Sequence, residues 1–209
     1  MFGELYHSER GAIGESEHVF IRMGLDYVLY HSHSPYNNMP PKEIKIFDVG
    51  FGSGLNAWLT LQRFVEKGFS VDYHAVEFYP IDPETAIALV YTDSPLFAAM
   101  HRCAWESSQE ITSGFKLTKY QAALENFVFP VFSPNFDLIY FDAFAPCTQP
   151  ELWNAVVMEK MYKMLASDGV LTTYSAKGSV KRALRHAGFI VERLPGALGK
   201  RHMLRAVKV

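Results

Sequence analysis

"IKIFDVGFGSGLN", residues 44–56, joins an apolar run to three closely spaced glycines and the start of a helical pattern. The apolar part is typical of a buried β-strand, and residues 55–67 carry apolar side chains at helical spacing up to Gly68. A buried strand that turns directly into a helix is the beginning of a βαβ unit, which further parallel strands extend. This stretch therefore predicts an α/β fold.

Strand and helix patterns keep alternating along the chain. Strand-like runs lie at 44–50, 71–80, 115–121, 135–144 and 169–176, and helical patterns lie at 55–67, 83–105, 153–165 and 179–188. Two further strand-like runs, 189–196 and 202–209, predict an antiparallel C-terminal edge. We expect a Rossmann-like, mostly parallel sheet whose ligands lie at the carboxyl ends of its strands.

The first 35 residues follow a different pattern. Short alternating runs at 3–8 and 17–24, separated by Gly11 and Gly14, predict a small β-hairpin. We therefore expect an N-terminal hairpin extension at 1–35 and one main domain at 36–209.

The composition is that of a soluble globular protein. The chain has 209 residues, a net charge of −2 and two cysteines, Cys103 and Cys147. No apolar run approaches the ~18 residues of a membrane helix, and the N-terminus lacks a signal-peptide pattern. Two cysteines cannot form a zinc site by themselves. These features predict a cytoplasmic protein with reduced thiols, no metal and no membrane contact, and we expect a monomer.

Basic residues are concentrated at the C-terminal end. Beyond residue 176 the single acid is Glu192, and it is outnumbered by Lys177, Lys181, Arg182, Arg185, Arg193, Lys200, Arg201, Arg205 and Lys208. Such segregation is compatible with a polyanionic partner and equally with a solvated surface.

The glycine turn at Gly50, Gly52 and Gly54 has the spacing G-x-G-x-G. A dinucleotide site would need a small residue where Leu55 stands, so this spacing favours a nucleoside with a methionine tail over one with a pyrophosphate. The alternative is a tight structural turn. Glu77 ends the second strand, where a carboxylate can accept hydrogen bonds from both ribose hydroxyls, although an ordinary solvated glutamate is the alternative there.

The glycine turn and this acid together resemble the S-adenosylmethionine (SAM) site of class I methyltransferases. Asp48 fits the acid that often precedes their glycine loop. The resemblance implies that Gln121, at the end of the third strand, contacts the adenine, where many relatives carry an aspartate.

"FDAFAPCTQPELW", residues 141–153, follows the fourth strand. Methyltransferases that act on amino groups often place a short acidic loop there. Asp142 can orient an amine and accept its proton, and Phe144 can stack on a planar base. A strand-end cap and core packing are the structural alternatives. Pro146-Cys147 is similar to the nucleophile loop of pyrimidine carbon-5 methyltransferases, but their downstream Glu-Asn pair is missing, so we expect Cys147 to be incidental.

Five segments together resemble the methyltransferase domain of the tRNA 5-methylaminomethyl-2-thiouridine biosynthesis proteins, the MnmC family. They are "ELYHSERGAIGESEHVFI" (4–21), "GFGSGLN" (50–56), "FDAFAPCTQPELW" (141–153), "YSAKGSVKRALRHAGF" (174–189) and "GKRHML" (199–204). The resemblance implies SAM-dependent methylation of the 5-aminomethyl group of (2-thio)uridine at the tRNA wobble position. It implies Asp142 as the catalytic residue, and Asp48, Gly50, Gly52, Gly54, Glu77 and Gln121 as SAM contacts.

The resemblance also suggests a use for the basic C-terminal end. A cationic surface there would bind the phosphates of the anticodon stem-loop, with the wobble base flipped toward Phe144. Its residues would be Lys181, Arg182, Arg185, Lys200 and Arg201. Because the chain ends at Val209, we expect a stand-alone form without the FAD oxidoreductase domain. A methyltransferase for a small-molecule amine and a catalytically inactive SAM- or RNA-binding module remain the alternatives.

Overall fold

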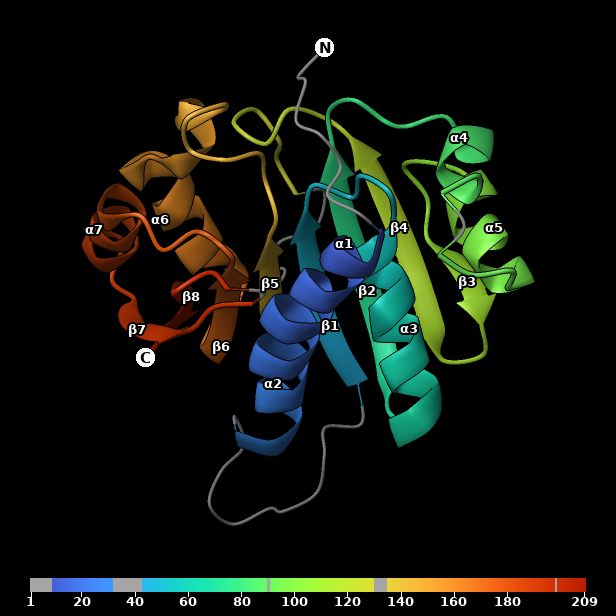
Figure 1. The fold of residues 1–209 in the computed structure, drawn as a ribbon, viewed down its shortest axis with the longest axis horizontal. Coiled ribbons are helices and arrows are strands. Elements are labelled where there is room, and N and C mark those ends of the chain that lie inside the picture. Colours follow the sequence, from blue (N-terminus) through green and yellow to red (C-terminus); the bar gives the residue numbers. More distant parts are fainter. Residues whose placement is uncertain (1–8, 32–42, 90, 130–134, 198) are drawn as a thin grey trace.

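The computed structural model describes residues 9–31, 43–89, 91–129, 135–197 and 199–209. Its strands are β1 (Glu43–Val49), β2 (Ser70–Glu77), β3 (Gln109–Thr112), β4 (Phe115–Gln121), β5 (Phe136–Phe141), β6 (Leu165–Thr173), β7 (Ile190–Pro195) and β8 (His202–Val207). They form one sheet in the order β3-β4-β2-β1-β5-β6-β8-β7 (Figure 1).

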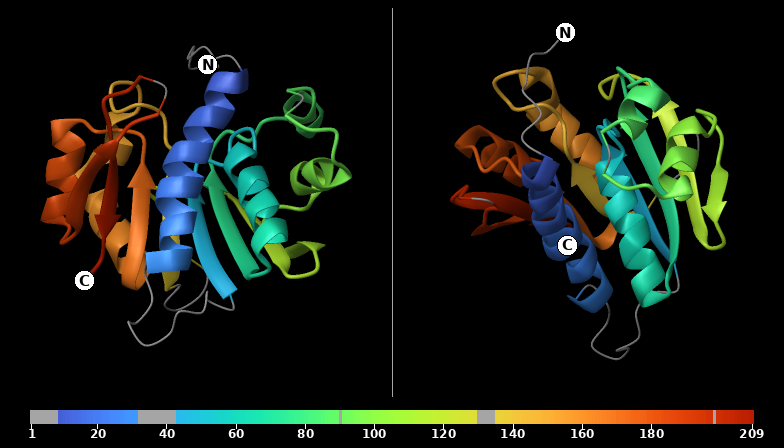
Figure 2. Two further views of the ribbon diagram at one scale, coloured as in Figure 1. Left: turned by 60° about the horizontal axis from the view of Figure 1, so that its bottom comes forward. Right: turned by 45° about the vertical axis from the view of Figure 1, so that its right-hand side comes forward.

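Helices cover both faces of this sheet. They are α1 (Glu9–Ser16), the π-helical η1 (Glu17–Leu25), α2 (Asp26–His31), α3 (Leu55–Lys67), α4 (Pro83–Ile87), α5 (Pro95–Arg102), the 3-10 helix η2 (Pro150–Trp153), α6 (Ala155–Met164) and α7 (Gly178–His186). The N-terminal helices and α3 lie side by side on one face, and α6 and α7 lie on the other (Figures 1 and 2). None of these helices combines the length and apolar character needed to cross a bilayer.

The sheet confirms the predicted α/β architecture. Strands β4, β2, β1, β5 and β6 run parallel, and β8 pairs antiparallel with both β6 and β7 at the expected C-terminal edge. Strand β3, which the sequence analysis missed, pairs antiparallel with β4 at the opposite edge. The chain order reverses at β1, which lies between β2 and β5. Sheets of this kind bind ligands beyond the carboxyl ends of the strands at such a point.

Strand β1 shows why the sheet is buried on both sides. Ile44 and Ile46 pack under the N-terminal helices and α3, whereas Phe47 and Val49 pack on the face covered by α6. Side chains that alternate between two covered faces are mostly apolar, which explains the largely apolar run in the sequence; Asp48 is the fully buried exception.

The predicted N-terminal β-hairpin is wrong, because residues 9–31 form consecutive helical segments. Ile21, Leu25 and Val28 are fully or almost fully buried, and their spacing of four and three residues is that of one helix face. The short runs of alternating polar and apolar residues were interpreted as strands, and the helical spacing, which needs a longer stretch to recognise, was missed. The predicted domain boundary at residues 35 and 36 lies outside the described residues.

The long helical region predicted over residues 83–105 is also wrong in its extent. The structure has two short helices, α4 and α5, each with proline at its first position. The Asp82 carboxylate accepts from the Thr85 N–H (3.1 Å), and the Ser94 hydroxyl accepts from the Leu96 N–H (3.3 Å). Side-chain capping followed by proline is a helix-start signal, and it occurs twice in this segment.

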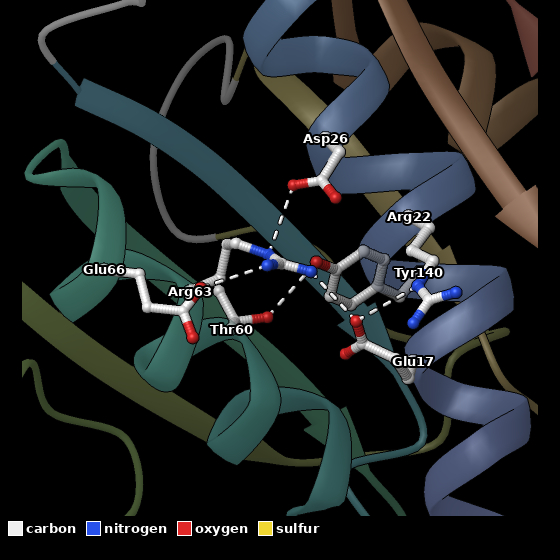
Figure 3. A network of polar contacts seen from close by, with 7 residues as sticks. All are labelled: Glu17, Arg22, Asp26, Thr60, Arg63, Glu66 and Tyr140. Atoms are coloured by element: carbon white, nitrogen blue, oxygen red, sulfur yellow. Dashed lines mark hydrogen bonds and ion pairs between the residues drawn. The ribbon is translucent and has the colours of Figure 1, made fainter.

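An arginine ties the N-terminal helices to α3 (Figure 3). The Arg63 guanidinium lies 2.9 Å from a carboxylate oxygen of Glu17, 3.2 Å from one of Asp26 and 3.0 Å from one of Glu66. The Arg63 side chain is only 18% exposed, whereas that of Glu66 is 59% exposed. Burial raises the pKa of Asp26, the charge of Arg63 opposes this shift, and Glu17 adds to it. Arg63 therefore offsets the repulsion between two half-buried acids.

We expect Arg63→Met to lower the free energy of unfolding by about 2 kcal/mol, between the values typical of exposed and buried ion pairs. The methionine retains the packing of the side-chain stem but leaves Glu17 and Asp26 facing each other without a cation. Urea unfolding followed by circular dichroism measures the change. Glu66→Gln is the control, and it should shift stability by less than about 0.5 kcal/mol. Equal stabilities of the two variants would contradict the role of Arg63.

Candidate active site

The glycine loop after β1 is tied to both neighbouring strands. The Gly50 N–H donates to the Val76 carbonyl (2.9 Å), and the Asp142 N–H donates to the Val49 carbonyl (3.1 Å). Gly50 has a φ of 97°, and a Cβ built on it would lie 2.9 Å from the backbone oxygen of Asp142. Only glycine allows this approach, so the loop after β1 and the loop after β5 form one packed unit.

Glu77 holds the glycine loop from the end of β2. One of its carboxylate oxygens accepts from the Gly52 N–H (3.0 Å), and the other accepts from the Tyr79 N–H (2.8 Å). Each carboxylate oxygen has further acceptor capacity. Glu77 therefore lies against the loop at the place where the sequence predicted a contact with ribose hydroxyls.

A cavity of about 790 Å³ opens at the carboxyl ends of β1, β2, β4 and β5. Six of the predicted site residues line it together, so they meet at one place: Gly50, Gly52, Glu77, Asp142, Phe144 and Lys200. Its volume is in the range of pockets that hold cofactor-sized ligands. A Cβ on Gly52 would have only the Gly50 oxygen, 3.9 Å away, as a near neighbour, so this part of the loop faces open space.

Acidic residues predominate in the cavity wall. Lys200 is the basic residue among the described lining residues, against Glu15, Glu77, Glu125, Asp142 and Glu151. Opposite charges attract most strongly where water is partly excluded, so such a wall favours cationic ligands. A sulfonium and a protonated amine are both cations of this kind.

Asp142 lies directly after β5 on the cavity wall. One of its carboxylate oxygens accepts from the side-chain amide of Asn56 (2.9 Å), which comes from the first turn of α3. Burial raises the pKa of Asp142 to about 7, while the Asn56 hydrogen bond lowers it; the charge of Glu15 also raises it, and that of Lys200 lowers it. A carboxyl group with this pKa can both accept and release a proton near neutral pH.

The sequence predicted that Asp48 contacts the cofactor, and the structure places its side chain elsewhere. Asp48 is fully buried and is not part of the cavity lining. One carboxylate oxygen accepts from the Tyr73 hydroxyl (2.7 Å), and burial raises the pKa of Asp48 well above its usual range. Asp48 therefore lies inside the core, where Tyr73 of β2 holds its carboxyl group.

Gln121 and Gly54 also lie outside the cavity lining. The Gln121 side chain is exposed at the end of β4, and the lining is formed by the following residues, Ala122 and Ala123. Gly54 begins α3 with a φ of 69°, and a Cβ on it would lie 2.7 Å from Nε2 of His101. The His101 ring donates through this nitrogen to the Ser53 carbonyl (3.2 Å), and burial lowers its pKa to about 4. His101 thus supports the glycine loop as a neutral side chain.

The N-terminal helix contributes residues that the sequence analysis did not assign to the site. Ala12, Glu15, Ser16 and Phe20 line the cavity, and the Glu15 carboxylate forms an ion pair with Lys200. The available signal was the resemblance of residues 4–21 to the entry segment of the family. They were not considered as site residues because the sequence analysis assigned residues 1–35 to a hairpin separate from the main domain.

The predicted basic surface separates into two parts. Lys200 lies at the cavity, whereas Lys181, Arg182 and Arg185 project from α7 and Arg201 precedes β8, all outside the cavity lining. Arg205, from the same C-terminal group, is used internally. It pairs with Glu192 (2.7 Å), and its guanidinium lies 3.5 Å from the Tyr27 ring centroid.

Cys147 is exposed and reduced, and it is not part of the cavity lining. Its sulfur lies 4.0 Å from the Thr148 hydroxyl. This position gives no support to a thiolate nucleophile. Within the described ranges no group of three or more His, Cys, Asp or Glu residues is arranged to hold a metal ion.

Residues 100–209, more than half of the chain, match the model of a family of S-adenosyl-L-methionine-dependent methyltransferases. The chain belongs to this family. Two curated relatives are similar to this methyltransferase along 98% of its length. Both are named tRNA 5-methylaminomethyl-2-thiouridine biosynthesis bifunctional protein MnmC. The protein of Azoarcus sp. (strain BH72) is 28% identical, and that of Burkholderia thailandensis is 30% identical. The matches cover 33% and 32% of those proteins, so the methyltransferase spans about a third of their length.

Solved structures agree with this assignment. The crystal structure of MNMC2 from Aquifex aeolicus superposes with a TM-score of 0.75 at 25% identity, over 98% of this methyltransferase and 63% of that chain. The Streptomyces venezuelae protein DesVI has a TM-score of 0.53 at 13% identity, covering 96% and 94% of the two chains, and it shows the fold alone. These findings confirm the MnmC-like resemblance and the class I methyltransferase fold.

The cavity of this methyltransferase suits SAM in volume and charge. Gly50 lets the loops after β1 and β5 approach each other, Gly52 leaves open space that a side chain would fill, and Glu77 supplies acceptors beside it. SAM contributes a methyl group on a positively charged sulfur, which the acidic wall attracts. The residues that would hold it are therefore Gly50, Gly52 and Glu77, with Asp142 next to the loop.

Proposed function

We propose that this methyltransferase methylates the primary amine of 5-aminomethyl-(2-thio)uridine at the wobble position of tRNA. The observation that carries the proposal is Asp142, a carboxyl group with a pKa of about 7 on the wall of an acidic cavity. The names of the MnmC relatives, which refer to tRNA 5-methylaminomethyl-2-thiouridine biosynthesis, support this acceptor.

The acceptor chemistry needs a base at this point. A primary amine arrives largely as an ammonium at neutral pH, and its nitrogen must lose a proton to expose a lone pair. The Asp142 carboxylate can hold that proton, and Asn56 orients the carboxylate through its 2.9 Å hydrogen bond. Methyl transfer is a displacement, so the proposed reaction requires neither flavin nor metal.

The proposed RNA contact lies outside the cavity. Phosphates would be repelled by the acidic wall, and they require cations outside it. These are the exposed Arg182, Arg185 and Arg201 and the half-buried Lys181. Phe144 lines the cavity and is 40% exposed, so a flipped uracil that enters the cavity would meet its ring. The proposed arrangement therefore separates the binding of phosphates from the binding of the amine.

Methyl transfer to modified tRNA tests this function. We expect the protein with SAM to add the mass of one methyl group to 5-aminomethyluridine in tRNA, detected by nucleoside mass spectrometry. tRNA with unmodified uridine at that position is the control and should gain nothing. Absence of methylation of both the 2-thio and the oxygen forms of the aminomethyl nucleoside would contradict the proposal.

A methyltransferase for a small cationic amine is the second candidate, because the acidic cavity alone would suit it. The two candidates differ in salt dependence. Binding of tRNA through several phosphates weakens steeply with salt, whereas capture of a small amine does not. Turnover of free amines without RNA, at rates little affected by salt, would favour the second candidate.

A further inference from the structure

A lysine ammonium lies at the cavity between an acid and an aromatic ring. Nζ of Lys200 pairs with the Glu15 carboxylate and lies 5.1 Å from the centroid of the Tyr174 ring. All three residues line the cavity that contains Asp142. A carboxylate together with the face of an aromatic ring binds an ammonium through charge and the ring quadrupole.

Glu15 and Tyr174 are fixed by contacts of their own. The Glu15 side chain is 21% exposed, and it belongs to α1, directly before the segment that Arg63 ties to α3. The Tyr174 hydroxyl donates to the carbonyl of Ala143 (2.9 Å), the residue next to Asp142. The acid and the ring are therefore held in place by the same elements that position the catalytic loop.

Lys200 is held less firmly than its partners. Its side chain is 46% exposed and belongs to the segment between β7 and β8. Both members of the Glu15–Lys200 pair affect Asp142, because the charge of Glu15 raises the pKa of Asp142 and that of Lys200 lowers it. An ammonium at the position of Nζ is thus within electrostatic reach of the catalytic carboxyl.

We propose that Glu15 and Tyr174 form the subsite for the amino group of the acceptor, and that the Lys200 ammonium occupies this subsite until the acceptor displaces it. The identity of that acceptor as a tRNA aminomethyl group rests on the proposed function. A primary ammonium on a flexible carbon chain is chemically similar to the aminomethyl group of the nucleoside. Displaced Lys200 would point to solvent, where its charge can meet a phosphate.

The first test measures discrimination between RNAs by binding, without turnover. Fluorescence anisotropy gives the Kd of an anticodon stem-loop carrying 5-aminomethyluridine and of one carrying uridine, both with S-adenosylhomocysteine present. We expect the wild type to prefer the amine by about tenfold and Glu15→Gln to lose this preference. Glu66→Gln, which changes an exposed acid outside the cavity lining, is the matched control and should retain it. Retained preference in Glu15→Gln would overturn the proposal.

The second test needs no RNA. In Lys200→Met the subsite loses its internal ammonium, so propylammonium should bind about tenfold more tightly than to the wild type, as measured by NMR shifts of the Tyr174 ring. Adding Glu15→Gln to this variant should abolish the gain. Equal binding of propylammonium by the single and double variants would overturn the subsite.

The two tests separate this subsite from the proposed function. If the alkylammonium binds as expected but aminomethyl-tRNA is never methylated, the subsite stands and the tRNA function fails. If the wild type methylates that tRNA while the variants leave both discrimination and alkylammonium binding unchanged, the function stands and the subsite fails.

Discussion

Asp142→Asn is expected to lower kcat by about 10²- to 10⁴-fold, the range typical for loss of a general base. Asparagine has the same shape and can still accept the hydrogen bond from Asn56, but it cannot hold the proton of the acceptor nitrogen. SAM affinity, measured by calorimetry, should change little. Asp168→Asn, an exposed change outside the cavity lining, should leave kcat unchanged.

The pH dependence of kcat/KM tests the same role of Asp142. Burial raises the pKa of Asp142 to about 7, so below that pH the group is protonated and cannot act as a base. The wild-type value of kcat/KM should therefore fall below about pH 7, because kcat/KM reports ionisations of the free enzyme. Asp142→Asn should lack this limb and retain only the ionisation of the amine. If kcat/KM of the variant still falls below about pH 7, a group other than Asp142 causes that fall.

Gly50→Ala is expected to lower SAM affinity by about 10- to 100-fold. At a φ of 97° any side chain is strained, which costs about 1–3 kcal/mol. The new Cβ would also lie 2.9 Å from the backbone oxygen of Asp142, so the two loops would have to move apart. Because these loops form adjacent walls of the cavity, we expect turnover to fall as well.

Gly68→Ala is the matched control for this effect. Gly68 ends α3 with a φ of 74°, and a Cβ built on it meets no heavy atom within 4 Å. Its replacement should produce a similar backbone strain without displacing either loop. Calorimetry should therefore give wild-type SAM affinity for Gly68→Ala. Equal affinities for the two alanine variants would show that the close approach at Gly50 is unimportant.

The parallel core of the fold was predictable from local patterns. The apolar run of β1, the helix after it and the stop at Gly68 are found where the sequence placed them. A strand buried on both faces needs a run of apolar residues, and a helix end needs glycine in the left-handed region. The edges were less predictable. Strand β3 is short and half-buried, so its residues carry no distinct pattern, and α4 and α5 were separated only by a capping signal.

The candidate site was predictable where a residue follows a strand directly. Gly50 and Asp142 come directly after neighbouring parallel strands and Glu77 ends a third, and the geometry of such a sheet brings their positions together. Gln121 also ends a strand, but its side chain is exposed and the cavity is lined by the residues after it. Strand position therefore predicts proximity to the site, although it does not predict the direction of a side chain.

The sequence by itself determined the parallel strands, the glycine loop and the acid after β5, because each depends on residues close together in the chain. Only the tertiary structure brought Glu15 to Lys200, which is 185 positions away. It also buried Asp48 in the core and gave Asp142 its raised pKa. Pairing and burial of this kind depend on how α1 and the segment before β8 pack around the sheet, and no local pattern encodes that packing.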